Sequence, residues 1–199
     1  MLKSTLKINS KKIYVICPAN SRTGGPELLH QLVYTLKKYN KDAYLVYTGI
    51  QNKNYQILDE YKQYISNYLL VTEIEDSENN LIIVPEVDVL LLRKFSQIRK
   101  AIWWLSVNNF FTSHFSLCSL NYMIKRFGLI PAYKAFIKLL FISNKRLGIN
   151  SRIVRNVDYN FCQCEYAVDF CKIHKLQNPV LLFDYINDAY VNILNTKKK

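Results

Sequence analysis

"KKIYVICPANSRTGGPELLHQLVYTLKKYNKDAYLVYTG", residues 11–49, contains the pattern that decides the fold. Residues 11–17 form a short apolar run rich in β-branched and aromatic side chains, which is typical of a buried strand. From 25 to 39 the apolar residues recur at helical spacing, and two lysines in the last turn suit the negative end of the helix dipole. Residues 42–49 form a second strand-like run that ends in glycine. A strand, a helix and a strand in this order predict one crossover unit of a parallel sheet.

The same alternation continues along the chain. We expect further strands at 68–74, 80–86, 100–107 and 157–163, a strand followed by an Asx-rich turn within 178–187, and further helices at 55–65, 86–96 and 164–176. This order predicts an α/β fold, with a parallel sheet that carries helices on both faces. We expect a single Rossmann-like domain over residues 1–199.

The charge of the chain is concentrated in one stretch. The 199 residues carry a formal net charge of +12. Residues 1–88 contain ten basic and ten acidic side chains, and residues 158–199 contain five of each. Between Val89 and Val157 there are twelve lysines or arginines and no carboxylate. The sequence therefore predicts an electrostatic partner for this stretch.

Residues 108–150 interrupt the alternation with a basic, aromatic segment, which we expect to be a helical insertion. A helix from Pro131 onward would place Lys134, Lys138 and Lys145 in a narrow arc, with large apolar side chains covering most of the remaining surface. Such a helix is typical of a membrane interface, where its apolar side enters the acyl boundary and its lysines lie near anionic headgroups. The alternative is a core helix whose lysines mark its one solvent-exposed face.

Cysteine placement and hydropathy indicate the compartment. The five cysteines lack the paired spacing of a metal site, so we expect buried thiols in a reducing cytoplasm and no metal. No stretch of ~20 uncharged apolar residues predicts a membrane-spanning helix. The N-terminus also lacks the apolar region of a signal peptide. We expect a cytoplasmic protein that binds peripherally to the inner face of the membrane.

Two of the five glycines, Gly24 and Gly25, lie together between the first expected strand and helix. At this junction the first N–H groups of a helix point outward, and the absence of a Cβ lets a ligand approach the backbone. Ligands of open parallel sheets bind at the carboxyl ends of the strands, where this loop belongs. The loop has neither the G-x-G-x-x-G spacing of a dinucleotide site nor the lysine of a P-loop. A binding loop and a purely structural turn both remain open.

Three stretches resemble retaining GT-B-fold glycosyltransferases of bacterial polysaccharide and lipopolysaccharide synthesis. They are "KIYVICPANSRTGGPELLHQLVYTLKK", "KAIWWLSVNNFF" and "CQCEYAVDFCKIHKLQNPVLLFDYIND", which together span roughly residues 11–190. The resemblance lies in the order of the segments. It implies one half of a GT-B fold, the N-terminal domain that holds a sugar or lipid-linked acceptor. It also implies a nucleotide-sugar donor as co-substrate of the complete enzyme, with no cofactor bound by this chain.

The resemblance also suggests which residues form the site. It places Gly24, Gly25 and Glu27 in the cleft beside the donor diphosphate. Asn108, Asn109 and His114 would follow beyond the fifth strand, and no catalytic residue is assigned. The alternative for the two asparagines is a turn after the strand, and for His114 a loop or a buried aromatic cluster.

The sequence departs from the family in three places. Asn109 and Cys164 stand where the family often has an acidic residue and a serine; asparagine can bind a sugar hydroxyl but cannot act as a base. Glu78 and Glu86 have the eight-residue spacing of two glutamates that complete enzymes carry in their donor-binding domain. They flank an expected strand instead of a helix start, so we interpret the spacing as coincidence. We expect the donor-binding domain to be absent and to be encoded separately.

Two other functions remain as alternatives. The chain could be a non-catalytic fragment or stand-alone binding module with the same fold. Nucleic-acid binding is the third hypothesis, because the sequence pI is about 9.4 and aromatic residues alternate with basic ones. The basic stretch is apolar and contains no recognised nucleic-acid motif, so we expect no nucleic-acid partner.

Overall fold

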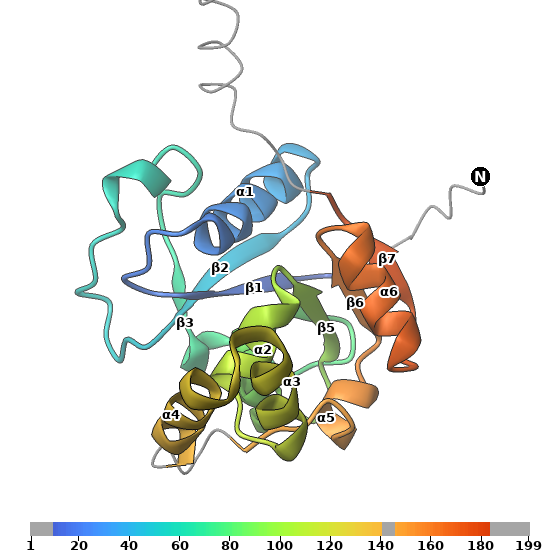
Figure 1. Ribbon diagram of the computed structural model, residues 1–199. Helices are drawn as coiled ribbons and strands as arrows, with labels where there is room; N and C mark the ends of the chain where they lie inside the picture. The colour runs from blue at the N-terminus through green and yellow to red at the C-terminus, as the bar shows by residue number, and fades with distance from the viewer. Residues whose placement is uncertain (1–9, 141–145, 184–199) are drawn as a thin grey trace, which may run out of the picture.

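A computed structural model describes residues 10–140 and 146–183. Seven strands form one sheet in the order β3-β2-β1-β4-β5-β6-β7, and every neighbouring pair is parallel. The strands are β1 (Ile13–Pro18), β2 (Ala43–Thr48), β3 (Leu69–Leu70), β4 (Leu81–Pro85), β5 (Arg99–Trp104), β6 (Tyr159–Cys162) and β7 (Pro179–Leu181). The predicted α/β, Rossmann-like architecture is confirmed (Figure 1).

Helices cover both faces of this sheet. The α-helices are α1 (Gly24–Lys38), α2 (Val107–Ser113), α3 (Leu117–Phe127), α4 (Leu129–Leu140), α5 (Arg152–Arg155) and α6 (Glu165–Ile173). Short 3-10 helices are η1 (Asp59–Tyr61), η2 (Val71–Glu73) and η3 (Glu86–Lys94). The core on one face contains side chains of α1, and the core on the other contains side chains of η3, α2, α5 and α6.

Alternation along β1 explains why the sheet is buried on both sides. Tyr14 and Ile16 enter one core, whereas Ile13, Val15 and Cys17 enter the other. All five are at most 3% exposed. Parallel strands covered on both faces need such unbroken apolar runs, which is why the sequence pattern predicted them well.

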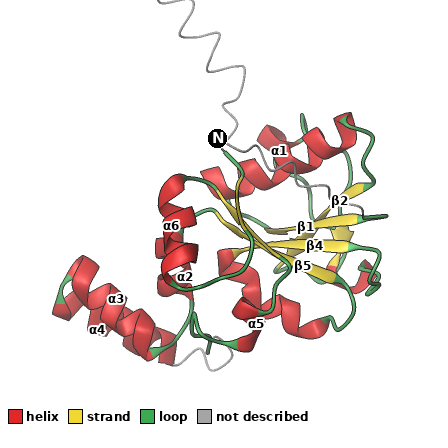
Figure 2. Cartoon of the chain, turned by 90° about the vertical axis from the view of Figure 1, so that its right-hand side faces the viewer, coloured by secondary structure: helices red, strands yellow, loops and turns green. Residues whose placement is uncertain are grey.

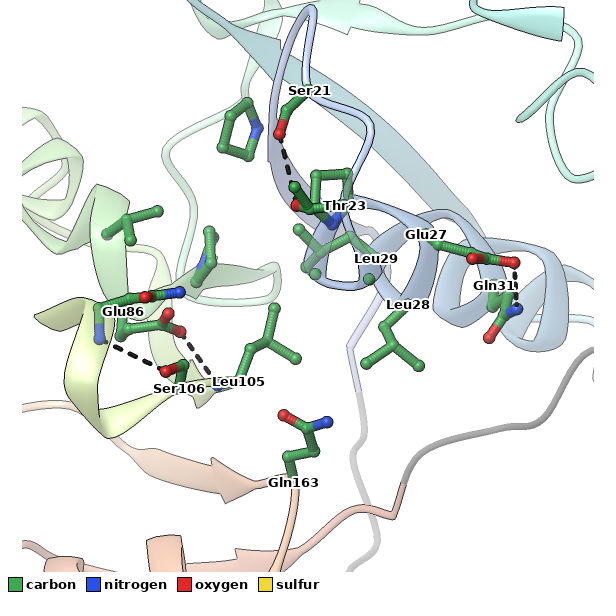
Figure 3. Close-up of a pocket in the computed structure, with 17 residues that line it drawn as sticks. Ser21, Thr23, Glu27, Leu28, Leu29, Gln31, Glu86, Leu105, Ser106 and Gln163 are labelled. Atoms are coloured by element: carbon green, nitrogen blue, oxygen red, sulfur yellow. Dashed lines mark hydrogen bonds between the residues drawn. The ribbon is translucent and has the colours of Figure 1, made fainter. Parts of the chain in front are cut away.

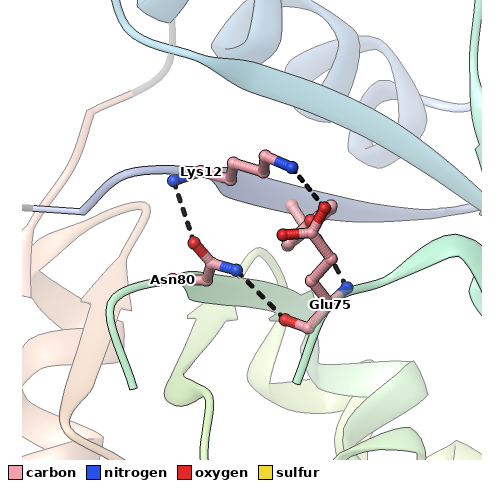
Figure 4. A network of polar contacts seen from close by, with 4 residues as sticks. Lys12, Glu75 and Asn80 are labelled. Carbon is pink, nitrogen blue, oxygen red and sulfur yellow. Dashed lines mark hydrogen bonds and ion pairs between the residues drawn. The ribbon is translucent and has the colours of Figure 1, made fainter. Parts of the chain in front are cut away.

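The order of the strands reverses beside β1. From β1 the chain moves outward to β2 and β3, and it then returns to place β4 on the other side of β1. Open α/β sheets bind ligands outside the carboxyl ends of the strands at such a switch point. At the other end of the strands, a polar network joins the residues just before β1 and β4 (Figure 4). There the Asn80 side chain accepts a hydrogen bond from the Lys12 backbone (3.2 Å) and donates one to the Glu75 carbonyl (3.1 Å), and Lys12 and Glu75 form an ion pair.

The predicted helix at 55–65 is wrong. Only η1 is helical there, and residues 50–68, which we call the tyrosine strap, otherwise connect β2 to β3 as irregular chain. Tyr55 and Tyr68 of the strap each pack edge-on against Tyr47 of β2, with ring centroids 5.0 Å apart. Burial of these rings outweighs the weak helical pattern of a short polar segment.

In the described part of the insertion, α3 and α4 follow the end of α2 and form a hairpin, where the sequence predicted one helix from Pro131 onward. Gly128 separates α3 from α4 with a φ of 85°, a conformation that favours glycine. Met123, Ala132 and Phe136 form a small core of their own, and Phe136 stacks on Phe115 with centroids 4.5 Å apart. Figure 2 shows this hairpin, residues 117–140, projecting beyond the sheet and its covering helices. Among the described residues, no helix is long and apolar enough to span a bilayer.

Candidate functional site

A cavity of about 660 Å³ opens at the switch point of the sheet. It lies between the first turns of α1 and the carboxyl ends of β1, β4, β5 and β6 (Figure 3). Its lining residues are Pro18, Ser21, Thr23, Gly24, Gly25, Pro26, Glu27, Leu28, Leu29, Gln31, Pro85, Glu86, Val87, Leu105, Ser106, Asn109 and Gln163. The volume falls within the range of small-molecule sites.

Gly24 and Gly25 are the first two residues of α1 and line this cavity. Neither has a positive φ, so the turn itself does not require glycine. A Cβ at Gly24 would meet nothing within 4 Å, and one at Gly25 would come 3.5 Å from Leu105 Cδ1, an ordinary contact. Their structural effect is to leave the space beside the helix start open. That effect favours the binding loop over the purely structural turn.

The tyrosine strap fixes the loop that leads into these glycines. The Asn20 backbone N–H donates to the Tyr55 hydroxyl at 3.1 Å, and the Tyr61 hydroxyl donates to the Ser21 carbonyl at 3.0 Å. Asn20 has a φ of 57°, so the loop makes a tight turn at the residue that Tyr55 holds. The loop is therefore held by side chains from a segment about thirty-five residues further along the chain.

Glu86 is the most buried charged side chain of the cavity. It follows β4 directly and is 2% exposed. Its Oε2 accepts a hydrogen bond from the Leu105 backbone N–H at 3.0 Å (Figure 3). Burial raises the pKa of the carboxyl to about 7, although hydrogen bonds from the β5–α2 connection and from the Asn109 side chain lower it. A carboxylate of this kind can take up or release a proton near neutral pH.

Carboxylates and amides dominate the polar groups of the cavity. Its lining, as far as the structure describes the chain, contains two carboxylates and three amides, and it contains no lysine, arginine or histidine. A phosphate site normally adds a cationic side chain to a helix N-terminus. Carboxylate and amide oxygens instead accept hydrogen bonds from hydroxyl or amino groups. The described lining therefore offers hydrogen-bond acceptors for hydroxyl or amino groups and no cationic side chain for a phosphate.

Four of the six predicted site residues line the cavity: Gly24, Gly25, Glu27 and Asn109. Asn108 does not line it, because its side chain turns to α3 and accepts a hydrogen bond from the Tyr122 hydroxyl. His114 is also outside the cavity lining. It is 1% exposed, and its ring lies 4.8 Å from that of Phe110, which matches the aromatic-cluster alternative.

The sequence interpretation missed Glu86, Gln31, Ser106 and Gln163 as cavity residues. The location of Glu86 in the cavity could have been predicted from the sequence. A polar residue directly after a buried parallel strand lies at the carboxyl ends of the strands, where open α/β sheets bind ligands. From the sequence we consider Glu86 only for its eight-residue spacing from Glu78, which we interpret as coincidence. Glu78 precedes β4 and Glu86 follows it, so the two glutamates flank the strand at its opposite ends and do not form a pair.

The cysteines contribute no ligand cluster. In the described part of the chain no three His, Cys, Asp or Glu side chains are grouped to hold a metal ion. Cys162 and Cys171 are buried, and their sulfur atoms lie 3.7 Å apart. Cys164 caps the start of α6 and is exposed.

The hairpin carries a second unusual surface. Leu129, Ile130, Tyr133 and Ile137 fall on one side of α4 and are between 39% and 70% exposed. Lys134 is exposed beside them, as are Lys125 and Arg126 at the end of α3. We call these seven residues the hairpin surface. The side chain of Lys138 and the whole of Lys145, both predicted to contact a membrane, lie outside the described residues.

Comparison with known proteins gives no match to a family model, to a curated protein or to a solved structure.

Proposed function

We propose that this domain binds a carbohydrate acceptor in the switch-point cavity, as the acceptor-binding half of a GT-B-type glycosyltransferase. The observation that carries the proposal is the chemistry of the cavity lining: two carboxylates and three amides, without a cationic side chain among the described residues. Sugar hydroxyls donate hydrogen bonds to such groups. The glycine pair at the start of α1 leaves room for the sugar against the backbone.

Donor chemistry belongs elsewhere in this proposal. Transfer from a nucleotide sugar releases a diphosphate, whose growing charge needs cationic or N–H donors. Because the described cavity lining offers carboxylates and no cationic side chain, we assign the donor to a second domain. This chain would orient the acceptor hydroxyl, with Glu86 and Asn109 on the wall formed by β4 and α2.

A carbohydrate array tests the proposal without knowledge of the acceptor. The chain should bind a subset of neutral oligosaccharides and should bind free nucleotides weakly. Gly25→Ala and Gly25→Val should lower sugar binding progressively, since each adds volume beside the helix start. Gly148→Ala is a matched control, because the added Cβ would make only an ordinary contact, 3.8 Å from Ser116, outside the cavity lining.

Binding of nucleotides with no binding of any oligosaccharide would refute the proposal and favour a nucleotide site on the same fold. Sugar binding that ignores both Gly25 substitutions would place the acceptor elsewhere. A stand-alone carbohydrate-binding module, the non-catalytic alternative, predicts the same binding with no partner domain. Co-expression with an adjacent reading frame and a transfer assay separate these two functions.

We further propose that the hairpin surface binds an anionic bilayer, which would place the domain at the cytoplasmic face of the membrane. The supporting observation is that the hairpin that carries the exposed apolar side chains of α4 also carries the exposed Lys125, Arg126 and Lys134. Apolar groups on one side of a helix can enter the acyl boundary while basic groups meet the headgroups. Residues 89–157 hold twelve basic and no acidic side chains, so no carboxylate of this stretch opposes the attraction.

Flotation with vesicles containing phosphatidylserine tests this surface. Each basic group near a bilayer contributes about 1 kcal/mol, so Lys125→Glu with Arg126→Glu should weaken binding roughly 30-fold or more. Lys37→Glu with Lys38→Glu is the matched control, since it changes the net charge equally on α1. Equal losses in both double variants would indicate attraction to the net charge alone. Binding to an oligonucleotide at the same salt, without flotation, would support the nucleic-acid hypothesis instead.

A further inference from the structure

Gln31 holds a polar atom that the protein leaves unpaired. The residue lies on α1, lines the cavity and is 4% exposed. Its Oε1 is buried and finds no hydrogen-bond partner within residues 10–140 and 146–183. An unpaired buried acceptor is costly, and native proteins retain few of them.

The orientation of the Gln31 amide follows from its neighbours. Its Nε2 donates to Glu27 Oε1 at 3.3 Å and to the Tyr64 hydroxyl at 3.1 Å. An ionised carboxylate can only accept, so the NH₂ group must face Glu27 and the carbonyl oxygen must face away from it. Tyr64 belongs to the tyrosine strap, and its hydroxyl also donates to Glu27 Oε1 at 3.3 Å. Figure 3 shows Glu27 and Gln31 side by side on the α1 wall of the cavity.

We infer that Gln31 Oε1 and the Glu27 carboxylate form a subsite that accepts hydrogen bonds from adjacent hydroxyl groups of the ligand, with Tyr64 as a positioning residue. The inference rests on the proposed carbohydrate function and assigns its specificity to this wall of the cavity. Because Gln31 Oε1 is buried, the Gln31 side chain must turn toward the cavity for a ligand hydroxyl to satisfy it, and a sugar that lacks this hydroxyl leaves the acceptor buried and unpaired. Such a loss discriminates roughly tenfold or more between two otherwise identical sugars.

The probes are methyl glycopyranosides of glucose, galactose and mannose, together with their single-deoxy derivatives, measured by saturation-transfer NMR on the full chain. Wild-type protein should lose affinity for two deoxy sugars that lack neighbouring hydroxyls. Gln31→Met keeps the length of the side chain and should bind the parent sugar roughly tenfold more weakly, without distinguishing it from these deoxy forms. Gln63→Met is the control, because Gln63 is an exposed strap residue that donates to the Glu60 carbonyl and is not among the residues that line the cavity.

Tyr64→Phe provides a second variant that leaves Gln31 and Glu27 in place. It should reduce the difference in affinity between the parent and the deoxy sugars more than the affinity for the parent sugar, because the Gln31 amide loses the Tyr64 hydroxyl that orients it. Urea unfolding identifies any variant that fails to fold. If Gln31→Met and Tyr64→Phe keep wild-type discrimination while Gly25→Val abolishes binding, the subsite is refuted and the carbohydrate function stands. If wild-type protein binds none of the sugars or their oligomers, the proposed function fails together with the subsite.

Discussion

The protonation of Glu86, a cavity residue, should make the free energy of unfolding of the domain depend on pH. The pKa of this carboxyl is about 7 in the folded chain, against an ordinary value of 4.5. Between these two pH values the native state binds more protons than the unfolded state, so the free energy of unfolding falls as pH rises. A separation of 2.5 pH units corresponds to about 3 kcal/mol lost between pH 4.5 and pH 8.

His30 opposes this trend in nearly the same pH range. It is completely buried, and burial lowers its pKa from 6.5 to about 4. The unfolded state therefore binds more protons between pH 4 and 6.5, and stability rises with pH by about 3 kcal/mol. The two contributions oppose each other in the wild-type curve, so only a variant separates them.

Glu86→Gln supplies that separation. We expect the unfolding free energy of wild type minus that of Glu86→Gln to fall by about 3 kcal/mol from pH 4.5 to pH 8, because all other groups are shared. Urea unfolding at half-unit pH intervals measures this difference. Glu78→Gln is the control, since it makes the same substitution at an exposed glutamate. A Glu86 difference that does not change with pH would refute the buried, desolvated carboxylate.

Three further predictions use the same domain. His30→Gln should remove the contribution that raises stability between pH 4 and 6.5, so the free energy of unfolding of this variant should fall with pH through the remaining contribution of Glu86. Urea unfolding at pH 5 and pH 7 measures this change, and a retained rise would contradict the prediction. Gly25→Ala should change the free energy of unfolding by no more than about 1 kcal/mol, because its Cβ meets only Leu105 at 3.5 Å; a larger loss would mean that the glycine serves the fold. Leu129→Ser with Ile130→Ser should leave stability within about 1 kcal/mol, because both side chains are already exposed, and should reduce vesicle flotation; cooperative destabilisation would mean that this face is covered by protein.

The sheet could be predicted from the sequence because its strands are short apolar runs separated by turns. Both faces of a parallel sheet are buried, so local composition alone identifies the strands of β1 and β4. The segment at 55–65 was predicted as a helix because apolar and polar residues alternate there at helical spacing. Its tyrosines instead make hydrogen bonds to the backbone of Asn20 and Ser21, in the loop before the glycine pair. These contacts join distant segments, so no local pattern predicts them.

The cavity could be predicted only in part. Gly24, Gly25 and Glu27 follow a strand and begin a helix, so their location follows from order along the chain. Glu86 depends on which strands become neighbours of β1, and the strand order is a property of the whole sheet. His114 shows the reverse problem. Its residue type suggested chemistry, whereas packing against Phe110 buries it outside the cavity lining.

The location and the class of the ligand can be measured together by nuclear magnetic resonance. Titration of ¹⁵N-labelled protein with a neutral oligosaccharide selected on the array should shift the backbone N–H signals of Gly24, Gly25, Leu105 and Ser106 and leave those of the hairpin unchanged. Shifts confined to other surfaces, or shifts at these four residues with nucleotides and not with sugars, would contradict a carbohydrate site at the switch point of this sheet.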